Sequence, residues 1–240
     1  MFDSNYNEKE VVTRSYPKVV FQLNQNLDAE MENFDEIDFL WHPELAKALK
    51  KTGGEKNKII NEYVINFYEG HRDELETARS VFQAEWDEVQ PEFFNITDKL
   101  FNNHQWPAGR YLGFPSIFNS NQRFLETKTF QIFSLKNDVG VPNSVAHEML
   151  HFIFYDYLEK NYREYVKEIG GDKLWALSEI FDDLAFEQPE YAKFKAKIPS
   201  FYQQLQPTVS TFREKLIGKP FNIESFIDAA KNIDVIPTKL

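Results

Sequence analysis

Apolar residues recur at every third or fourth position over long parts of the chain, which is the spacing of a helix with one buried face. Residues 58–103 show this pattern throughout, and Gly70 and Pro91 are expected to divide them into two or three helices. The same spacing predicts a helix over residues 173–186 and two or three more between residues 194 and 230. The chain is therefore predicted to be mainly helical.

A few segments have the composition of strands instead. Residues 18–23 form a short apolar run, and residues 109–118 and 127–134 are rich in aromatic and β-branched side chains, with alternation in the second. The polar residues 119–122 between them indicate a turn, so these two segments are expected to form a small antiparallel sheet. Together with the helices, this predicts an α+β fold.

One predicted helix is apolar on almost every side. Residues 145–154 place apolar side chains nearly all round its first three turns, which indicates that the helix is buried. Either Asn143 or Ser144 is expected to cap its N-terminus, and the helix is expected to run to about Ile169, where two glycines stop it. Polar residues on this helix therefore need partners inside the protein.

That helix contains the sequence H-E-x-x-H, formed by His147, Glu148 and His151. Residues four apart lie on one side of a helix, so both imidazoles can reach one point while Glu148 stands about 100° to the side. This arrangement binds Zn²⁺ and places a general base beside a water molecule at the metal. With the His and Glu content of this chain, the motif is expected by chance about 0.01 times. We therefore predict a metal site on this helix, in preference to two core histidines bonded to backbone carbonyls.

The remaining composition restricts the ligands. The chain has no Cys, so a metal has to be held by His, Asp or Glu. Of the other three histidines, His71 and His104 lie among polar or charged neighbours near predicted breaks and are expected to be solvated surface residues, and the same is expected of His42. A catalytic zinc needs a third protein ligand. Because no His follows His151, a ligand further along the chain has to be a carboxylate.

A formal net charge of −11 disfavours two classes of partner. Nucleic-acid binding and binding to an anionic membrane both depend on arrays of Lys and Arg. The first residues lack the basic and apolar regions of a secretory signal, and no window approaches about 18 uncharged apolar residues. We therefore expect a cytoplasmic protein that acts neither on nucleic acid nor at a membrane. The sequence indicates no particular oligomeric state.

Four carboxylates on or just after the helix predicted over residues 173–186 are candidates for the third ligand: Glu179, Asp182, Asp183 and Glu187. Glu179 and Asp183 are four positions apart and share a face of the helix. Asp182 lies about 100° round from Asp183 and is expected to point away. The extended metzincin motif is excluded, because Phe154 stands where its Gly would be.

In these residues the chain resembles the gluzincin class of zinc metallopeptidases. In that class a Glu from a second helix completes an H-E-x-x-H site, and an Asp four residues later supports one of the histidines. The resemblance covers about residues 127–186. It implies that Glu148 is the catalytic general base and that Asp183 supports His147. The Zn²⁺ ligands that it implies are His147, His151 and Glu179.

The resemblance also implies a zincin-like architecture, a mainly helical fold in which a small antiparallel or mixed sheet packs on the active-site helix. Residues 1–54 would form a mixed N-terminal segment and residues 55–142 an upper lobe of helices followed by the sheet. Residues 143–240 would form the active-site helix and a helical lower lobe, with both lobes in one catalytic domain. The strand near residues 130–134 is then expected to pair with an extended substrate by strand addition.

The implied function is that of a hydrolase, a zinc metallopeptidase that cleaves a peptide or protein substrate. Two alternatives stay open: a non-enzymatic binding module on a zincin scaffold whose acidic surface recruits a basic partner, and a zinc hydrolase of a non-peptide bond. Gluzincins also use a Tyr or His to stabilise the oxyanion. The candidates here are Tyr155, Tyr162, Tyr165, Tyr191 and Tyr202.

Overall fold

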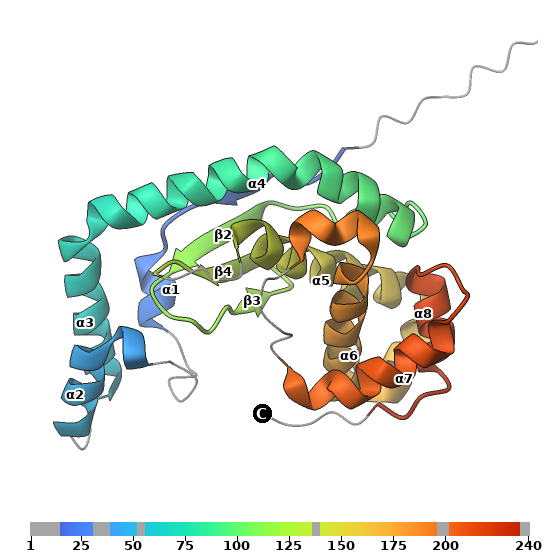
Figure 1. Ribbon diagram of the computed structural model, residues 1–240. Coiled ribbons are helices and arrows are strands. Elements are labelled where there is room, and N and C mark those ends of the chain that lie inside the picture. The colour runs from blue at the N-terminus through green and yellow to red at the C-terminus, as the bar shows by residue number, and fades with distance from the viewer. Residues whose placement is uncertain (1–14, 31–38, 52–55, 136–139, 196–201, 236–240) are drawn as a thin grey trace, which may run out of the picture.

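The computed structural model describes residues 15–30, 39–51, 56–135, 140–195 and 202–235. Most of them are helical, and their strands form one small mixed sheet, so the chain has the predicted mainly helical α+β fold (Figure 1). In chain order the helices and strands are β1 (Val19–Phe21), α1 (Gln25–Ala29), α2 (Pro43–Lys51), α3 (Lys56–Gly70), α4 (Arg72–Leu100), β2 (Tyr111–Ser116), β3 (Arg123–Phe124), β4 (Thr129–Phe133), α5 (Val141–Asn161), α6 (Arg163–Phe186), α7 (Gln206–Leu216) and α8 (Ile223–Ala230). Short 3₁₀ helices span Phe39–Trp41, Pro189–Phe194 and Gln203–Leu205.

The sheet has the strand order β1-β2-β4-β3. β1, β2 and β4 are parallel, and β3 is antiparallel to β4. The prediction of an antiparallel pair is therefore wrong for β2 and β4, because the chain reverses direction twice between them. The loop that contains residues 119–122 leads into β3, and the turn at residues 125–128 leads back into β4.

The position of β4 contradicts the expectation that residues 130–134 pair with a substrate. β4 is an inner strand, with β2 on one side and β3 on the other. Beyond the end of β3 its amides are also engaged. Gln131 N–H donates to the carbonyl oxygen of Gln122 at 2.8 Å, and Phe133 N–H donates to Oδ1 of Asn121 at 2.9 Å. The outer strand on this side of the sheet is β3.

One face of the sheet packs against α4 and α5. Phe21 of β1 meets Phe82 of α4 edge-on, with ring centroids 5.9 Å apart. Phe152 of α5 meets Tyr111 of β2 in the same way at 5.4 Å. Gly113 makes room for the Phe21 ring, since a Cβ at this position would lie 2.4 Å from it. These contacts hold α5 against the sheet as the buried helix that its apolar sequence predicts.

Side chains alternate between the two faces of a strand, so the opposite face of the sheet carries Ser116 and Gln131. Both donate hydrogen bonds to the buried carboxylate of Asp28 in α1. Near this face, α2 and α3 form a small apolar cluster with Ile117 and Phe118. The main apolar cluster is larger and runs from β1 through α4, α5 and α6 to α8.

The main cluster draws on each part of the predicted domain division. It includes side chains from residues 1–54, from residues 55–142 and from residues 143–240. β1 belongs to the first of these parts and forms an edge strand of the sheet. The N-terminal segment therefore contributes directly to the core, and the division into two lobes stays a prediction.

The helical stretch predicted over residues 58–103 is interrupted at Gly70 but not at Pro91. α3 ends at Gly70 as predicted, whereas α4 continues through Pro91 (Figure 1). A proline inside a helix removes one hydrogen bond. Trp86 and Phe93, on either side of Pro91, are both fully buried, so packing of both halves on one core keeps α4 in one piece.

The helix with H-E-x-x-H is shorter than predicted. α5 ends at Asn161 rather than near Ile169, and α6 begins two residues later. Gly170 has a φ of 74°, a conformation that favours glycine, and interrupts the helical conformation inside α6. The predicted glycine break therefore exists, but a second break precedes it. Of the helical stretch predicted after residue 194, residues 196–201 lie outside the described residues, and α7 and α8 follow.

The other histidines differ in their surroundings. His42 was predicted to be a surface residue, but it is only 1% exposed. Its Nδ1 lies 2.9 Å from the hydroxyl of Tyr63 and its Nε2 2.7 Å from the carbonyl oxygen of Ile117. His104 is half-buried beside a carboxylate of α5, so that prediction is also wrong. His71 is exposed as predicted. The residues next to His42 in the sequence do not identify the distant segments that bury it.

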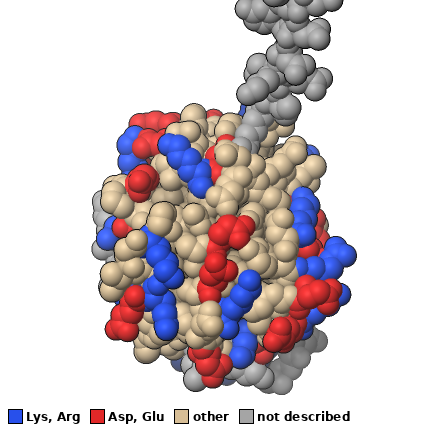
Figure 2. Space-filling view, turned by 90° about the vertical axis from the view of Figure 1, so that its right-hand side faces the viewer, with Lys and Arg blue, Asp and Glu red and all other residues tan. Residues whose placement is uncertain are grey.

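The surface shown in Figure 2 has a mixed charge. Lys and Arg side chains lie among Asp and Glu side chains, so acidic residues do not gather into one patch on this face. The net charge of −11 therefore gives no localised docking site for a basic partner here. Within the described ranges, none of the helices has both the length and the apolar character needed to cross a membrane.

Candidate metal centre

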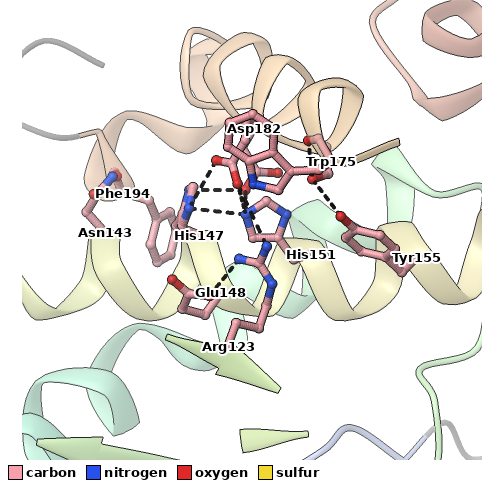
Figure 3. A network of polar contacts seen from close by, with 11 residues as sticks. Arg123, Asn143, His147, Glu148, His151, Tyr155, Trp175, Asp182 and Phe194 are labelled. Carbon is pink, nitrogen blue, oxygen red and sulfur yellow. Dashed lines mark hydrogen bonds and ion pairs between the residues drawn. The ribbon is translucent and has the colours of Figure 1, made fainter. Parts of the chain in front are cut away.

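The candidate site lies between α5 and α6, which pack against each other (Figure 3). α5 contributes His147, Glu148 and His151, and α6 contributes Glu179 and Asp182. Four of these side chains are buried, and His147 is the most exposed, with 22% of its side chain accessible. A group of ionisable side chains is thus enclosed in the core, where it needs compensating partners.

α5 begins earlier than its sequence predicts. Its first residue is Val141, and Gly140 precedes it with a φ of 93°, a conformation that favours glycine. Asn143 and Ser144, the predicted N-caps, therefore lie inside the first turn. The side chain of Asn143 instead donates a hydrogen bond to the carbonyl oxygen of Phe194. This contact ties the start of α5 to the segment that follows α6.

The two imidazoles converge as their spacing predicts. Nε2 of His147 and Nε2 of His151 lie 3.1 Å apart. Two zinc–nitrogen bonds that meet at a tetrahedral angle place their nitrogens about 3.3 Å apart. Glu179 lies against the same two atoms, with Oε2 3.5 Å from His147 Nε2 and Oε1 3.4 Å from His151 Nε2. The structure therefore brings the three ligands predicted from the sequence together.

Asp182 was expected to point away, but it faces both histidines. Its Oδ2 lies 3.1 Å from Nδ1 of His147 and 3.3 Å from Nε2 of His151. His147, His151 and Asp182 offer ligand atoms that all lie within 4.8 Å of one another. Residues three and four positions after Glu179 both neighbour it on a helix. The rotation of α6 decides which of them faces α5, and the sequence does not fix that rotation.

The remaining candidate carboxylates have partners elsewhere. Oδ2 of Asp183 accepts a hydrogen bond from the side chain of Gln206 at 2.8 Å. Its predicted support of His147 stays a prediction. Glu187 is exposed, and its Oε2 accepts a hydrogen bond from Nε of Arg213 at 3.0 Å. Glu187 therefore takes part in a surface ion pair.

Several polar atoms of the site lack a hydrogen bond from the described residues. They are Oδ1 and Oδ2 of Asp182 and Nδ1 of His151, and all three are buried. A buried carboxylate without donors is costly unless a cation compensates it. Histidine nitrogens and carboxylate oxygens are common ligands of zinc and of other transition metals. The group of His147, His151 and Asp182 could therefore bind a metal ion.

Arg123 is a member of the site that the sequence did not reveal. It reaches from β3 towards α5, and its side chain is 14% exposed (Figure 3). Nη1 lies 2.9 Å from Oε2 of Glu148, and Nη2 lies 3.8 Å from Oε1 of Glu179. β3 has only two residues and shows no strand periodicity. The contact depends on the fold, which places β3 beside α5.

Burial shifts the pKa values of the group towards the uncharged forms. It raises the pKa of Glu179 to about 8, although Arg123 acts in the opposite direction. It also raises the pKa of Asp182 well above its ordinary value and lowers the pKa of His147 to about 3. Neutral imidazole is the form that binds metals. When ionised, the carboxylates of Glu148, Glu179 and Asp182 carry a charge of −3. Arg123 reduces this to −2, which suits a divalent cation.

One of the tyrosines considered for oxyanion stabilisation lies next to this group. The ring centroid of Tyr155 is 6.4 Å from that of His151, and its hydroxyl lies 3.3 Å from Oγ of Ser178. Tyr162 and Tyr191 form hydrogen bonds with side chains of α8 and α4. Tyr155 is therefore well placed among the candidates, and its role in catalysis stays a prediction.

Comparisons with models of protein families, with curated proteins and with solved structures find no match for this chain. The central feature of the site is a pair of converging histidines on a buried helix, flanked by carboxylates from the next helix.

Proposed function

We propose that the protein is a zinc-dependent metallopeptidase whose zinc ligands are His147, His151 and Glu179. The observation that carries this proposal is the convergence of two histidine Nε2 atoms and a buried carboxylate from a second helix. Three nitrogen or oxygen ligands with a fourth position for water or substrate are typical of catalytic zinc. Glu148 follows the first histidine directly, as a general base for that site does.

In this proposal Asp182 takes the supporting role that the sequence suggested for Asp183. A hydrogen bond from Nδ1 of His147 to Asp182, whose atoms lie 3.1 Å apart, would fix the ring and leave Nε2 free for the metal. In an alternative ligand set Asp182 binds the ion in place of Glu179, which matches the group whose ligand atoms all lie within 4.8 Å of one another. Zinc affinities of variants at the two positions distinguish these sets.

Bound zinc would supply a Lewis acid that activates water and polarises the scissile carbonyl. Glu148 then accepts a proton from the attacking water and delivers it to the nitrogen of the leaving amine. The C–N bond breaks, and a carboxylate and an amine are released. Burial raises the pKa of Glu148, which helps it to take up a proton, and Arg123 acts in the opposite direction. His147 and His151 stay neutral and hold their orientation.

The substitution Glu148→Gln tests this proposal. The amide is close in shape to the carboxylate but cannot accept the proton, so we expect peptide hydrolysis to fall by about 100- to 10,000-fold while bound zinc is retained. Activity and zinc content are measured on the same sample. Glu159→Gln, an exposed position on the same helix, is the matched control and should behave as wild type. Full activity in Glu148→Gln would show that Glu148 is not the base.

The ion pair between Glu148 and Arg123, at 2.9 Å, favours a second candidate. In a non-enzymatic binding module, Glu148 would serve as a structural partner of Arg123 and a bound metal would tie α5 to α6. Such a module would bind zinc and gain thermal stability from it without cleaving peptides or esters. Chelator-sensitive hydrolysis by the wild-type protein excludes this candidate.

A further inference from the structure

Arg123 holds the carboxylate that the proposed peptidase needs as its base. Its Nη1 lies 2.9 Å from Oε2 of Glu148, within the range of a charge-assisted hydrogen bond. This contact engages Oε2 of Glu148 with the guanidinium rather than with a water molecule. If the proposed function is right, Oε2 of Glu148 is free to act on water only when Arg123 has another partner.

The surroundings of Arg123 limit what that partner can be. Its side chain is 14% exposed, so water compensates poorly for a broken ion pair. Glu179 lies 3.8 Å from Nη2 and belongs to the proposed ligand set. A neutral carbonyl group of a substrate cannot balance a buried positive charge. Another carboxylate can, because the planar guanidinium binds carboxylates through two parallel hydrogen bonds.

The exposure of the site indicates where such a carboxylate would enter. The side chains of His147 and Arg123 are 22% and 14% exposed, whereas those of Glu148, Glu179 and Asp182 are 6% exposed or less. Arg123 is therefore more accessible than Glu148 to a molecule that approaches His147. Figure 3 shows the Arg123 side chain rising from β3 between the strand and the two histidines.

We propose that Arg123 binds a carboxylate of the substrate in exchange for Glu148, so that the enzyme cleaves peptides with a carboxylate close to the scissile bond. The exchange keeps the guanidinium paired at every stage. It releases Glu148 only when such a substrate is present. The carboxylate can be the C-terminal carboxylate of a peptide or the side chain of an Asp or Glu. Arg123 is then a specificity-determining residue.

The first test compares matched substrates. One pool of short peptides is prepared in two versions, with free and with amidated C-termini. Each version is made once with Asp and Glu and once with Asn and Gln in their place. We expect the zinc-loaded wild type to cleave one carboxylate-bearing form at least about tenfold faster in kcat/KM than its neutral counterpart, which is about 1.4 kcal/mol. The form that shows the preference identifies the source of the carboxylate.

Variants then assign the preference to one side chain. In Arg123→Gln we expect the ratio between the carboxylate and neutral forms to fall below about threefold, with zinc content unchanged. Arg110→Gln alters an exposed arginine just before β2 and should keep the wild-type ratio. Equal cleavage of both forms by the wild type would overturn the proposal without any variant. If Arg123→Gln lowers kcat/KM equally for the carboxylate and the neutral peptides, the proposal is also overturned. Arg123 would then be a residue that only positions Glu148.

A binding measurement tests the exchange without turnover. Calorimetry follows the binding of N-acetyl-leucine and of N-acetyl-leucinamide to the zinc-loaded protein. Because Glu148 competes for Arg123, Glu148→Gln should bind the acid about tenfold more tightly than wild type, with no change for the amide. Arg123→Gln should lose the difference in affinity between the acid and the amide.

If the affinity for the acid is the same in all three proteins, the carboxylate binds zinc alone and the proposal is overturned. This result is independent of whether the protein cleaves any peptide, so it separates this inference from the proposed function.

Discussion

Asp28 and Asp182 are both only 1% exposed, yet their surroundings are opposite. The carboxylate of Asp182 receives no hydrogen bond from the described residues and lies against two imidazoles. The carboxylate of Asp28 accepts four hydrogen bonds at 2.6–3.1 Å. The donors are the side chains of Ser116, Gln131 and Tyr68 and the backbone N–H of Ile117.

This difference separates a structural carboxylate from a ligand-binding one. Burial raises the pKa of Asp28 to about 6 even with four hydrogen bonds, so a raised pKa does not by itself mark a functional site. What marks Asp182 is its set of partners: buried acceptor atoms without donors, beside imidazoles that can share a cation. Asp28 lies on the sheet face opposite to α5, so each group can be altered without direct contact with the other.

Substitution of Asp28 should give the largest effect. In Asp28→Ala, four buried donors lose their acceptor, so we expect the free energy of unfolding to fall by about 3–5 kcal/mol, with zinc per chain unchanged. Urea unfolding of chelator-treated protein measures this. Asp182→Ala removes an acceptor without donors and should change the same quantity by less than about 1 kcal/mol. Equal losses in the two variants would contradict the distinction between the carboxylates.

The effects on zinc affinity should have the reverse order, with a loss in Asp182→Ala and no change in Asp28→Ala. We expect Asp182→Ala to weaken zinc binding by about 10- to 100-fold, because in the proposed zinc complex Asp182 orients His147, whose Nδ1 lies 3.1 Å from its Oδ2. Asp183→Ala should change it by less than about threefold, since the carboxylate of Asp183 bonds Gln206. Competition with a metal-binding dye gives both dissociation constants. A larger loss in Asp183→Ala would restore the assignment made from the sequence.

The stability of the chelator-treated protein should fall as the pH rises from 6.5 to 8. Glu179 has a pKa of about 8 in the folded protein and an ordinary value of 4.5, so in this range the folded state keeps a proton that the unfolded state has lost. That contribution disappears as the pH approaches 8, a loss of about 2 kcal/mol. Asp182 acts in the same direction. Asp28, with a pKa of about 6, loses its contribution below this range.

Urea unfolding at the two pH values measures this slope. Glu179→Gln should flatten it, because the amide does not titrate. Saturating zinc should also remove most of it, because the metal holds the carboxylate in its ionised form. A slope that persists unchanged in Glu179→Gln would assign it to groups other than Glu179.

The convergence of the two histidines, which the sequence predicted, depends on short-range geometry. His147 and His151 converge because residues four apart on a helix share a side, whatever the rest of the chain does. Asp182 and Arg123 depend instead on packing. Asp182 faces the histidines because of the rotation of α6 against α5, and Arg123 enters from a strand of two residues. Neither the rotation nor the strand leaves a periodic signal in the sequence.

The features of the fold also divide into those that follow from local sequence and those that depend on long-range packing. The helix end at Gly70 and the break at Gly170 follow from local backbone preferences. The parallel pairing of β2 with β4, the continuity of α4 through Pro91 and the burial of His42 depend on segments that lie far apart in the chain. Local sequence therefore predicted the two glycine breaks, but neither the ends of α5 nor how the elements pack.

The zinc content of the purified protein tests the central claim most directly. Wild-type protein prepared without chelators and supplied with zinc should carry about one zinc per chain, because three nitrogen and oxygen ligands converge in a buried site. Glu179→Ala, prepared in parallel, should carry almost none. Elemental analysis that finds well under half an equivalent of zinc in the wild type would contradict the account, and so would full occupancy in Glu179→Ala.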